Sequence, residues 1–139
     1  VPSLIRKAFE NEVLDVWGDG SPIRDFIHAK DVAEGMIRVV ELGYNKPINL
    51  GSGDGVTIKK IAETISNCMS DDCEIIWDTS KPSGDKQRIM NTKRAESLNI
   101  KPKISLSEGI KSTIEWYNNF GYDAEDRYNA FTDKLYKKN

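Results

Sequence analysis

Two side chains in the stretch 16–28 have types and spacing suited to holding an anionic ligand that carries a flat ring. Trp17 and Arg24 stand on either side of a Gly-Asp-Gly-Ser-Pro turn, flanked by β-like runs over 14–17 and 23–28. A hairpin-type connection of these runs would bring the indole and the guanidinium close together. A flat apolar face beside a planar cation can hold a base or sugar together with a phosphate. A solvent-exposed hairpin with one tucked tryptophan remains the alternative.

A polar loop over 78–88 supplies further positive charge. Lys81, Lys86 and Arg88 can converge on one anion from this single segment, and charge-assisted contacts to phosphate are strong. A loop of this composition is equally typical of a plain solvated surface, so a lid over an anion and a solvated loop both stay open.

A glycine cluster, Gly-Ser-Gly-Asp-Gly over 51–55, lies between a short apolar run and a helical pattern. A strand, a glycine loop and a helix in this order can bind phosphate at the helix N-terminus. The spacing is G-x-G-x-G, however, and the dinucleotide-binding fingerprint is G-x-G-x-x-G. A tight turn that needs positive φ is therefore the favoured interpretation.

No catalytic set can be assembled from these residues. Ser-His-Asp chemistry would have to use the single histidine, His28, and no nucleophile lies near it in the sequence. No tyrosine is followed four residues later by a lysine, which removes the proton-relay pair of one large class of reductases. Cys68 and Cys73 have no cluster of partner ligands, so no metal site is expected. Both are interpreted as reduced structural thiols, which suits the cytoplasm.

Length and charge bound the remaining function classes. The 139 residues suffice for one domain with a modest core. The 20 lysines and arginines nearly balance the 22 acidic residues, so no global field attracts nucleic acid or an anionic membrane. No apolar run approaches transmembrane length. The chain starts in a helical pattern without a methionine, and we therefore expect it to be part of a longer protein.

Apolar residues at helical spacing, with capping residues before them, predict the helices that would position these side chains. The predicted ranges are 2–11, 32–42, 58–65, 93–98 and 108–117. The predicted N-caps are Asp31 (with Glu34 in a capping box), Thr57, Thr92 and Ser107.

Short β-favouring runs predict further strands over 47–50 and 74–77, and an edge strand over 89–90. From 121 to 139 no period is clear, and an irregular or loosely docked tail with one helix near 130–136 is expected. The alternation of strands and helices indicates an α/β fold.

Three groups of residues resemble one known family. The run Trp17-Gly18-x-Gly20-Ser21-Pro22-x-Arg24-Asp25-Phe26-Ile27-His28-x-x-Asp31-Val32-Ala33 resembles the substrate-lobe signature of the extended short-chain dehydrogenase/reductases (SDRs) that act on nucleotide sugars. Residues 49–53 and 108–117 match the same family in the right order. Trp77-Asp78-Thr79-Ser80-Lys81-Pro82-x-Gly84 is most similar to the GDP-L-fucose synthases, an NADPH-dependent epimerase/reductase branch of it.

The resemblance covers residues 1–118 and implies a fold and a site. The implied fold is the C-terminal, substrate-binding part of an extended SDR of Rossmann type, over 1–119, with 120–139 as a tail. Arg24 and Arg88 match positions that grip the substrate diphosphate, and Lys86 can share that role because the loop departs from the family pattern. The substrate-binding residues implied are Lys7, Trp17, Arg24 and Arg88.

The resemblance also implies what lies elsewhere. The cofactor motif and the catalytic residues of the family would precede Val1, and Cys68 and Cys73 match no catalytic cysteine. NADP(H) is expected in the full-length enzyme and not on this chain alone. The implied partners are a nucleoside-diphosphate sugar, with a GDP-sugar favoured, and a second copy in a homodimer. A 4-epimerase, a dehydratase and a non-catalytic nucleotide-sugar-binding module remain alternatives.

Overall fold

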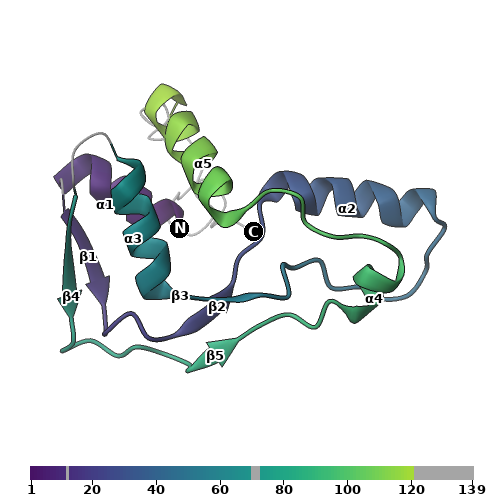
Figure 1. Cartoon of the computed structure of the whole chain (residues 1–139), viewed down its shortest axis with the longest axis horizontal. Coiled ribbons are helices and arrows are strands. Elements are labelled where there is room, and N and C mark those ends of the chain that lie inside the picture. Colours follow the sequence, from purple (N-terminus) through teal and green to yellow (C-terminus); the bar gives the residue numbers. More distant parts are fainter. Residues whose placement is uncertain (12, 70–72, 121–139) are drawn as a thin grey trace, which may run out of the picture.

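The computed structural model describes residues 1–11, 13–69 and 73–120, and Figure 1 shows their arrangement. Helices and strands are interspersed along the chain, as expected for an α/β fold. Their bounds are α1 Pro2–Asn11, β1 Val13–Trp17, β2 Ile23–Asp25, α2 Ala29–Glu41, β3 Gly55–Thr57, α3 Ile58–Cys68, β4 Glu74–Asp78, β5 Gln87–Arg88, α4 Lys93–Ser97 and α5 Leu106–Phe120. None of the helices described is long and apolar enough to cross a membrane.

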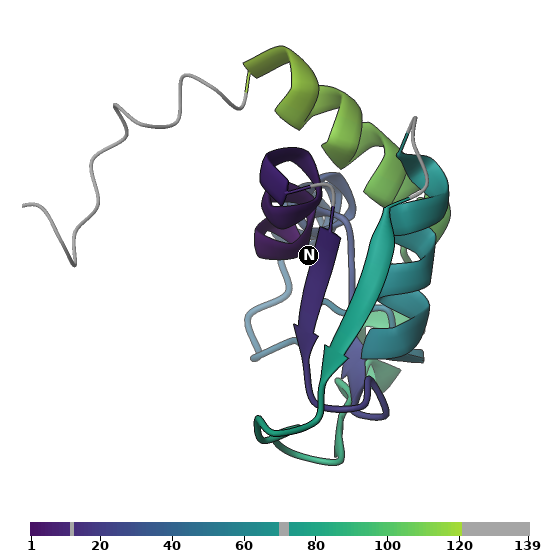
Figure 2. The same cartoon turned by 90° about the vertical axis from the view of Figure 1, so that its left-hand side faces the viewer.

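Two small sheets make up the β-structure of the described residues. In the first, β1 pairs in parallel with β4 (Figure 2), and the register sets Val16 opposite Trp77. In the second, β2 lies between β3, which is antiparallel to it, and β5, which is parallel to it. Each parallel pair is joined through a long crossover, as parallel strands require.

The predicted hairpin is therefore wrong, because β1 and β2 belong to different sheets. The turn between them carries the chain from one sheet to the other. Its Gly18 N–H donates to the Asp78 carbonyl (2.8 Å) and so continues the β1–β4 ladder. Its Gly20 carbonyl accepts from the N–H of Lys59 (2.9 Å), one of the free donors in the first turn of α3. The turn thus hydrogen-bonds to the end of β4 and to the first turn of α3, and it does not fold β2 back onto β1.

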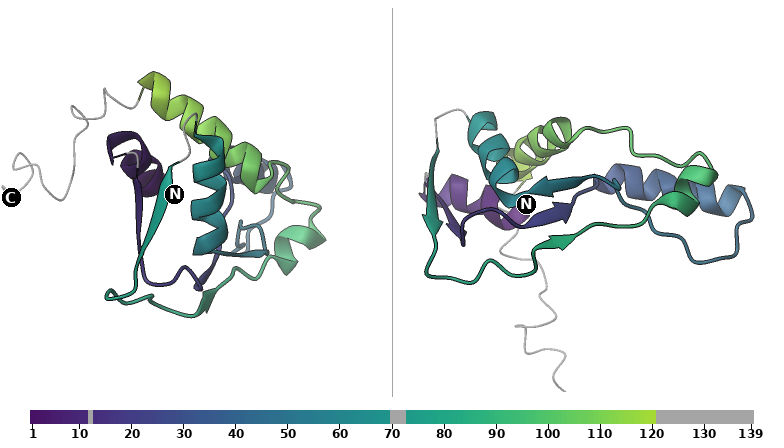
Figure 3. Two further views of the ribbon diagram at one scale, coloured as in Figure 1. Left: turned by 60° about the vertical axis from the view of Figure 1, so that its left-hand side comes forward. Right: turned by 60° about the horizontal axis from the view of Figure 1, so that its bottom comes forward.

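The hydrophobic core lies between the β1–β4 pair and the helices α1, α3 and α5 (Figure 2). Its largest fully buried side chains are Ile5, Leu14, Ile61 and Ile65. The i, i+4 spacing of Ile61 and Ile65 places both on the inner face of α3. The helix α2 leaves this core and lies beside α4 at the far end of the molecule (Figure 1, Figure 3).

Of the predicted helix caps, the one before α3 is confirmed and the one before α2 is wrong. Thr57 caps α3 as predicted, since its Oγ1 accepts from the N–H of Lys60 (3.1 Å). Asp31 does not cap α2, because the cap is His28, whose Nδ1 accepts from the N–H of Lys30 (3.2 Å). The buried Asp31 carboxylate instead accepts from two distant main-chain N–H groups, those of Lys103 and Ile104 (3.1 Å each).

The N-terminus of α5 is built by a capping box two residues before the predicted cap. The Ser105 N–H donates to the Glu108 carboxylate (2.9 Å), and the Glu108 N–H donates to Ser105 Oγ (3.3 Å). Before α4, the Thr92 hydroxyl bonds the Glu96 carboxylate and makes no side-chain cap bond. At α4 the Glu96 carboxylate thus takes the hydroxyl that would otherwise cap the helix.

Two predicted strands differ from the structure. No strand forms over 47–50. Arg94 Nη1 donates to the Pro47 carbonyl (2.7 Å), and the Asn49 side chain donates through Nδ2 to the Asn91 carbonyl (3.1 Å). The edge strand β5 lies at 87–88, two residues before the predicted position. The predicted tail over 121–139 lies outside the described residues.

Candidate nucleotide-sugar site

The two arginines singled out from the sequence lie opposite each other on neighbouring strands. In the parallel pair of β2 and β5, Arg24 is the register partner of Arg88. Residues directly opposite each other in a sheet point to the same face, with Cβ atoms about 5 Å apart. The strand register thus brings together two arginines that are 64 residues apart in the sequence. The structure brings these two guanidinium groups to one face.

Each arginine has a partner on the loop that leads into β5. Arg24 Nη1 donates to the carbonyls of Ile23 and Asp85 (2.8 Å each), and Arg88 Nη2 pairs with the Asp85 carboxylate. The Lys86 side chain is exposed, and its main-chain carbonyl accepts from the N–H of Ile23 (3.0 Å). Asp85 therefore lies between the two guanidinium groups.

Trp17 lies at the end of β1, where 60% of its surface is exposed. The cation over its indole is Lys81, with Nζ 5.8 Å from the ring centroid. The predicted partner, Arg24, faces Asp85 instead. The loop 78–88 thus contacts both the indole and Arg24, through different residues.

Lys7 reaches β1 from α1. Its Nζ donates to the carbonyl of Asp15 (2.8 Å) and lies 3.3 Å from the Asp15 carboxylate. Asp15 and Trp17 are two residues apart on one strand, so their side chains share a face. Lys7 and Trp17 therefore both lie at β1, whereas Arg24 and Arg88 lie on the second sheet.

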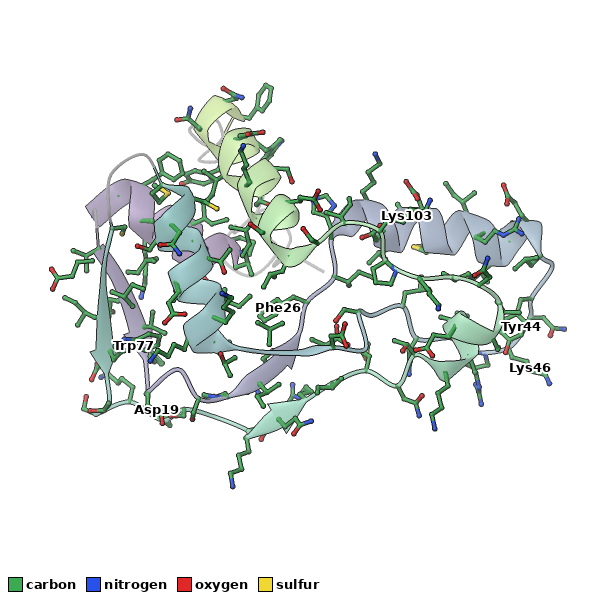
Figure 4. The ribbon with its side chains drawn as sticks, viewed as in Figure 1. Asp19, Phe26, Tyr44, Lys46, Trp77 and Lys103 are labelled. Atoms are coloured by element: carbon green, nitrogen blue, oxygen red, sulfur yellow. The ribbon has the colours of Figure 1, made fainter. Side chains whose placement is uncertain are left out.

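Glycine allows the loop 78–86 to approach the turn after β1. Gly18 has φ +80°, and a Cβ there would lie 2.4 Å from Ser83 Oγ. Gly20 has φ +74°, and its Cβ would lie 2.4 Å from the Trp77 ring. Figure 4 shows Trp77 and the turn residue Asp19 at this end of the molecule. Any side chain at either glycine would push the loop or the ring away.

The carboxylates of this loop region are held in place by short local contacts. The main-chain N–H and hydroxyl of Ser21 lower the pKa of Asp19. The Ser80 hydroxyl, together with its N–H and with Lys81, lowers the pKa of Asp78. Both side chains remain ionised at neutral pH and restrain the turns on which Trp17 and Lys81 stand.

A residue that the sequence analysis did not single out, Asp25, ties the second sheet together. Its carboxylate accepts from the N–H and hydroxyl of Ser52 (2.8 and 2.6 Å), the N–H of Gly53 (3.0 Å) and the N–H of Met90 (3.1 Å). Partial burial opposes its ionisation, but these hydrogen bonds outweigh that effect and lower the pKa of Asp25. In the sequence, the position of Asp25 inside a predicted strand, directly after Arg24, could have indicated this role.

The contacts of Asp25 also settle the role of the glycine cluster 51–55. Its N–H groups are directed at a carboxylate of the same chain, and Gly53 has φ +75°, as a tight turn requires. A Cβ at Gly51 would lie 2.7 Å from the side chain of Met90. The favoured interpretation, a tight turn, is confirmed.

An apolar hollow of about 440 Å³ lies away from the arginines, beside the start of α1 and the start of α5. Phe26 borders it and points toward the core helices (Figure 4). His28 also borders it, with Nε2 3.3 Å from Ser112 Oγ. In the neutral tautomer that lets His28 Nδ1 accept from the N–H of Lys30, Nε2 carries the proton and cannot accept one from Ser112. In that tautomer His28 is not a base for the Ser112 hydroxyl.

The described residues contain no group of three or more histidine, cysteine or acidic side chains that could hold a metal ion. Their polar chemistry is concentrated in the cations of the β2–β5 pair and of the loop 78–86. Guanidinium and ammonium groups are the side chains that make charge-assisted hydrogen bonds to anions.

The sequence and the fold have relatives among known proteins. Residues 1–51 match the epimerase family described as "NAD dependent epimerase/dehydratase family". The probable GDP-L-fucose synthase 1 of Oryza sativa is 36% identical over 124 residues, which cover 84% of this chain and 38% of that protein. The UDP-N-acetylglucosamine 4-epimerase of Methanobrevibacter ruminantium, solved with UDP-N-acetylmuramic acid, superposes with a TM-score of 0.74 at 28% identity over 85% of this chain and 38% of that one.

The chain is thus related in sequence and in fold to the extended SDRs of the NAD dependent epimerase/dehydratase family. A GDP-L-fucose synthetase of Naegleria fowleri bound to NADP shares the fold, with a TM-score of 0.79 at 23% identity over 87% of this chain and 40% of that one. The α/β fold with parallel strands is thus the Rossmann type expected from the sequence. The chain spans about two fifths of the length of the relatives that it matches.

Proposed function

We propose that this chain is the C-terminal, substrate-binding portion of a nucleotide-sugar epimerase/reductase of the GDP-L-fucose synthase type. The observation that carries the proposal is the register of β2 and β5, which sets Arg24 opposite Arg88. A diphosphate presents several anionic oxygens within a few ångströms, and two adjacent guanidinium forks match that geometry.

The rest of the proposed site follows from the exposed side chains near the ends of β1 and β4. Trp17 offers an exposed aromatic face to the base or sugar, and Lys7 supplies a cation from α1. Lys81 already lies over the indole, so a ring that stacks there would move it or pack beside it. The proposed substrate-binding residues are Lys7, Trp17, Arg24 and Arg88.

In the full-length enzyme we propose a 3,5-epimerisation followed by reduction of GDP-4-keto-6-deoxymannose at C4. NADPH would supply the hydride, from a cofactor-binding portion that precedes residue 1. The role of the described residues is to bind and orient the nucleotide so that the sugar reaches that portion. Residues 1–119 would form the substrate-binding region, and residues 120–139 would extend beyond it. A cytoplasmic homodimer is part of the same proposal.

The test is turnover by the full-length protein with GDP-4-keto-6-deoxymannose and NADPH, followed by the loss of NADPH absorbance. Consumption of NADPH and formation of GDP-fucose support the synthase assignment. Binding of the GDP-sugar without NADPH consumption would remove the synthase and leave a binding module. Absence of binding as well would refute the proposed site.

A second candidate is an epimerase or dehydratase that acts on another nucleotide sugar. It is favoured by the likeness in fold to the UDP-sugar 4-epimerase, since two arginines on a diphosphate do not distinguish one base from another. Conversion of UDP-N-acetylglucosamine by the full-length protein, with no net NADPH consumption, would select this candidate.

A further inference from the structure

Asp85 accepts hydrogen bonds from both arginines of the proposed diphosphate site. Its main-chain carbonyl accepts from Arg24 Nη1 (2.8 Å), and its carboxylate pairs with Arg88 Nη2. The preceding residue, Gly84, has φ +72°, and a Cβ there would lie 3.5 Å from Arg24 Nη2. The loop therefore passes directly against Arg24 and presents one residue, with two electronegative groups, to two guanidinium groups.

A ligand phosphate needs the same N–H donors that Asp85 uses. We propose that Asp85 is an affinity-determining residue that competes with the diphosphate: phosphate oxygens replace its carboxylate on Arg88. This inference rests on the proposed function, because it concerns the same pair of arginines. Before the exchange, the carboxylate holds Arg88 at the end of β5, and after it the carboxylate is a nearby negative charge that opposes the ligand.

The exposure of the pair makes the exchange feasible. The Arg88 and Asp85 side chains are 75% and 61% exposed, and an ion pair so open to water is weak. A diphosphate carries more charge than one carboxylate and can bind both arginines at once. The Asp85 carbonyl that accepts from Arg24 carries no formal charge, so an anionic phosphate oxygen is the stronger acceptor for this guanidinium.

The first test is Asp85→Asn, which keeps the size and the main-chain carbonyl and removes the charge. Titration calorimetry of the full-length protein with GDP is expected to show a two- to fivefold lower dissociation constant, the range set by an exposed ion pair. Glu41→Gln is the matched control. Glu41 also pairs with an arginine at i, i+3 spacing (Arg38, 3.0 Å, about 55% exposed), but at the far end of α2 (Figure 1). The Glu41→Gln protein should bind GDP with the same dissociation constant as the unmodified protein.

A double-mutant cycle separates competition for Arg88 from plain charge repulsion. In an Arg88→Gln background the carboxylate has no guanidinium to occupy, so Asp85→Asn should improve GDP binding by much less than in the unmodified protein. An equal improvement in both backgrounds would overturn the inference, because the carboxylate would then act only as a diffuse charge.

The outcomes distinguish this inference from the proposed function. GDP binding that depends on Arg24 but is unchanged by Asp85→Asn overturns the inference and leaves the proposed function intact. Absence of GDP binding in the unmodified protein overturns both. A lower dissociation constant in Asp85→Asn, with no change in Glu41→Gln, supports the inference.

Discussion

The substitution Arg24→Ala tests the proposed site at a half-buried cation. In the structure Arg24 donates to two main-chain carbonyls, of Ile23 and Asp85, and stands opposite Arg88 in the sheet. Loss of a guanidinium–phosphate contact removes a hydrogen bond between charged groups, worth about 1.5–3 kcal/mol. At about 2 kcal/mol the dissociation constant for GDP should rise roughly 30-fold.

Two further variants test whether the guanidinium group of Arg24 itself binds the phosphate. Arg24→Lys keeps the charge but loses the planar fork, so its affinity for GDP should lie between those of the alanine variant and the unmodified protein. Arg94→Ala is the control, since Arg94 likewise donates to a main-chain carbonyl, that of Pro47 (2.7 Å), but from α4. It should bind GDP normally.

The assay is titration calorimetry with GDP on the full-length protein at two salt concentrations. The penalty of Arg24→Ala should shrink at high salt, because screening weakens the lost contact in the unmodified protein. Equal dissociation constants for Arg24→Ala and Arg94→Ala would refute the placement of the diphosphate between β2 and β5.

Three further predictions concern the scaffold, each checked by thermal or urea unfolding of the intact protein. Asp25→Asn should lower the free energy of unfolding by about 1–2 kcal/mol relative to Asp54→Asn. Because the folded-state pKa of Asp25 is lowered, this loss of stability should be full near neutral pH and should vanish as the pH falls through and below the usual carboxyl range. A loss that persists in acid would contradict this. Gly18→Ala should cost about 1 kcal/mol or more, since φ is +80° and the new Cβ would clash with Ser83, and unchanged stability would show that the loop moves freely. Ile61→Ala, in the fully buried core, should cost about 2–5 kcal/mol, and a smaller loss would mean that the core collapses around the site.

Local chemistry determined most of the helices. Apolar spacing located α1 and α3, Thr57 marked the start of α3, and a following glycine marked the end of α2. These features act between residues three or four positions apart, so they can be read from one stretch of sequence. The residue types of the proposed site were also visible, since a tryptophan and a guanidinium have few equivalents for binding a ring and a phosphate.

Tertiary structure decided which segments meet. The sequence shows β1 and β2 as neighbours, yet β1 takes β4 as its partner, and β2 takes β3 and β5. Similarly, Asp31 looked like a local cap and instead binds main-chain groups about 70 residues away. A carboxylate accepts from whichever N–H the fold brings closest, and sequence proximity does not rank the candidates.

The arrangement of Arg24, Arg88 and Asp85 shows the same division. The sequence supplied two cations in separate segments and left a lid and a solvated loop as alternatives. Only the parallel register of β2 and β5 placed the guanidinium groups opposite each other, with Asp85 between them. Strand register depends on contacts across the whole chain, including those of Asp25 with Met90, and no local pattern encodes it.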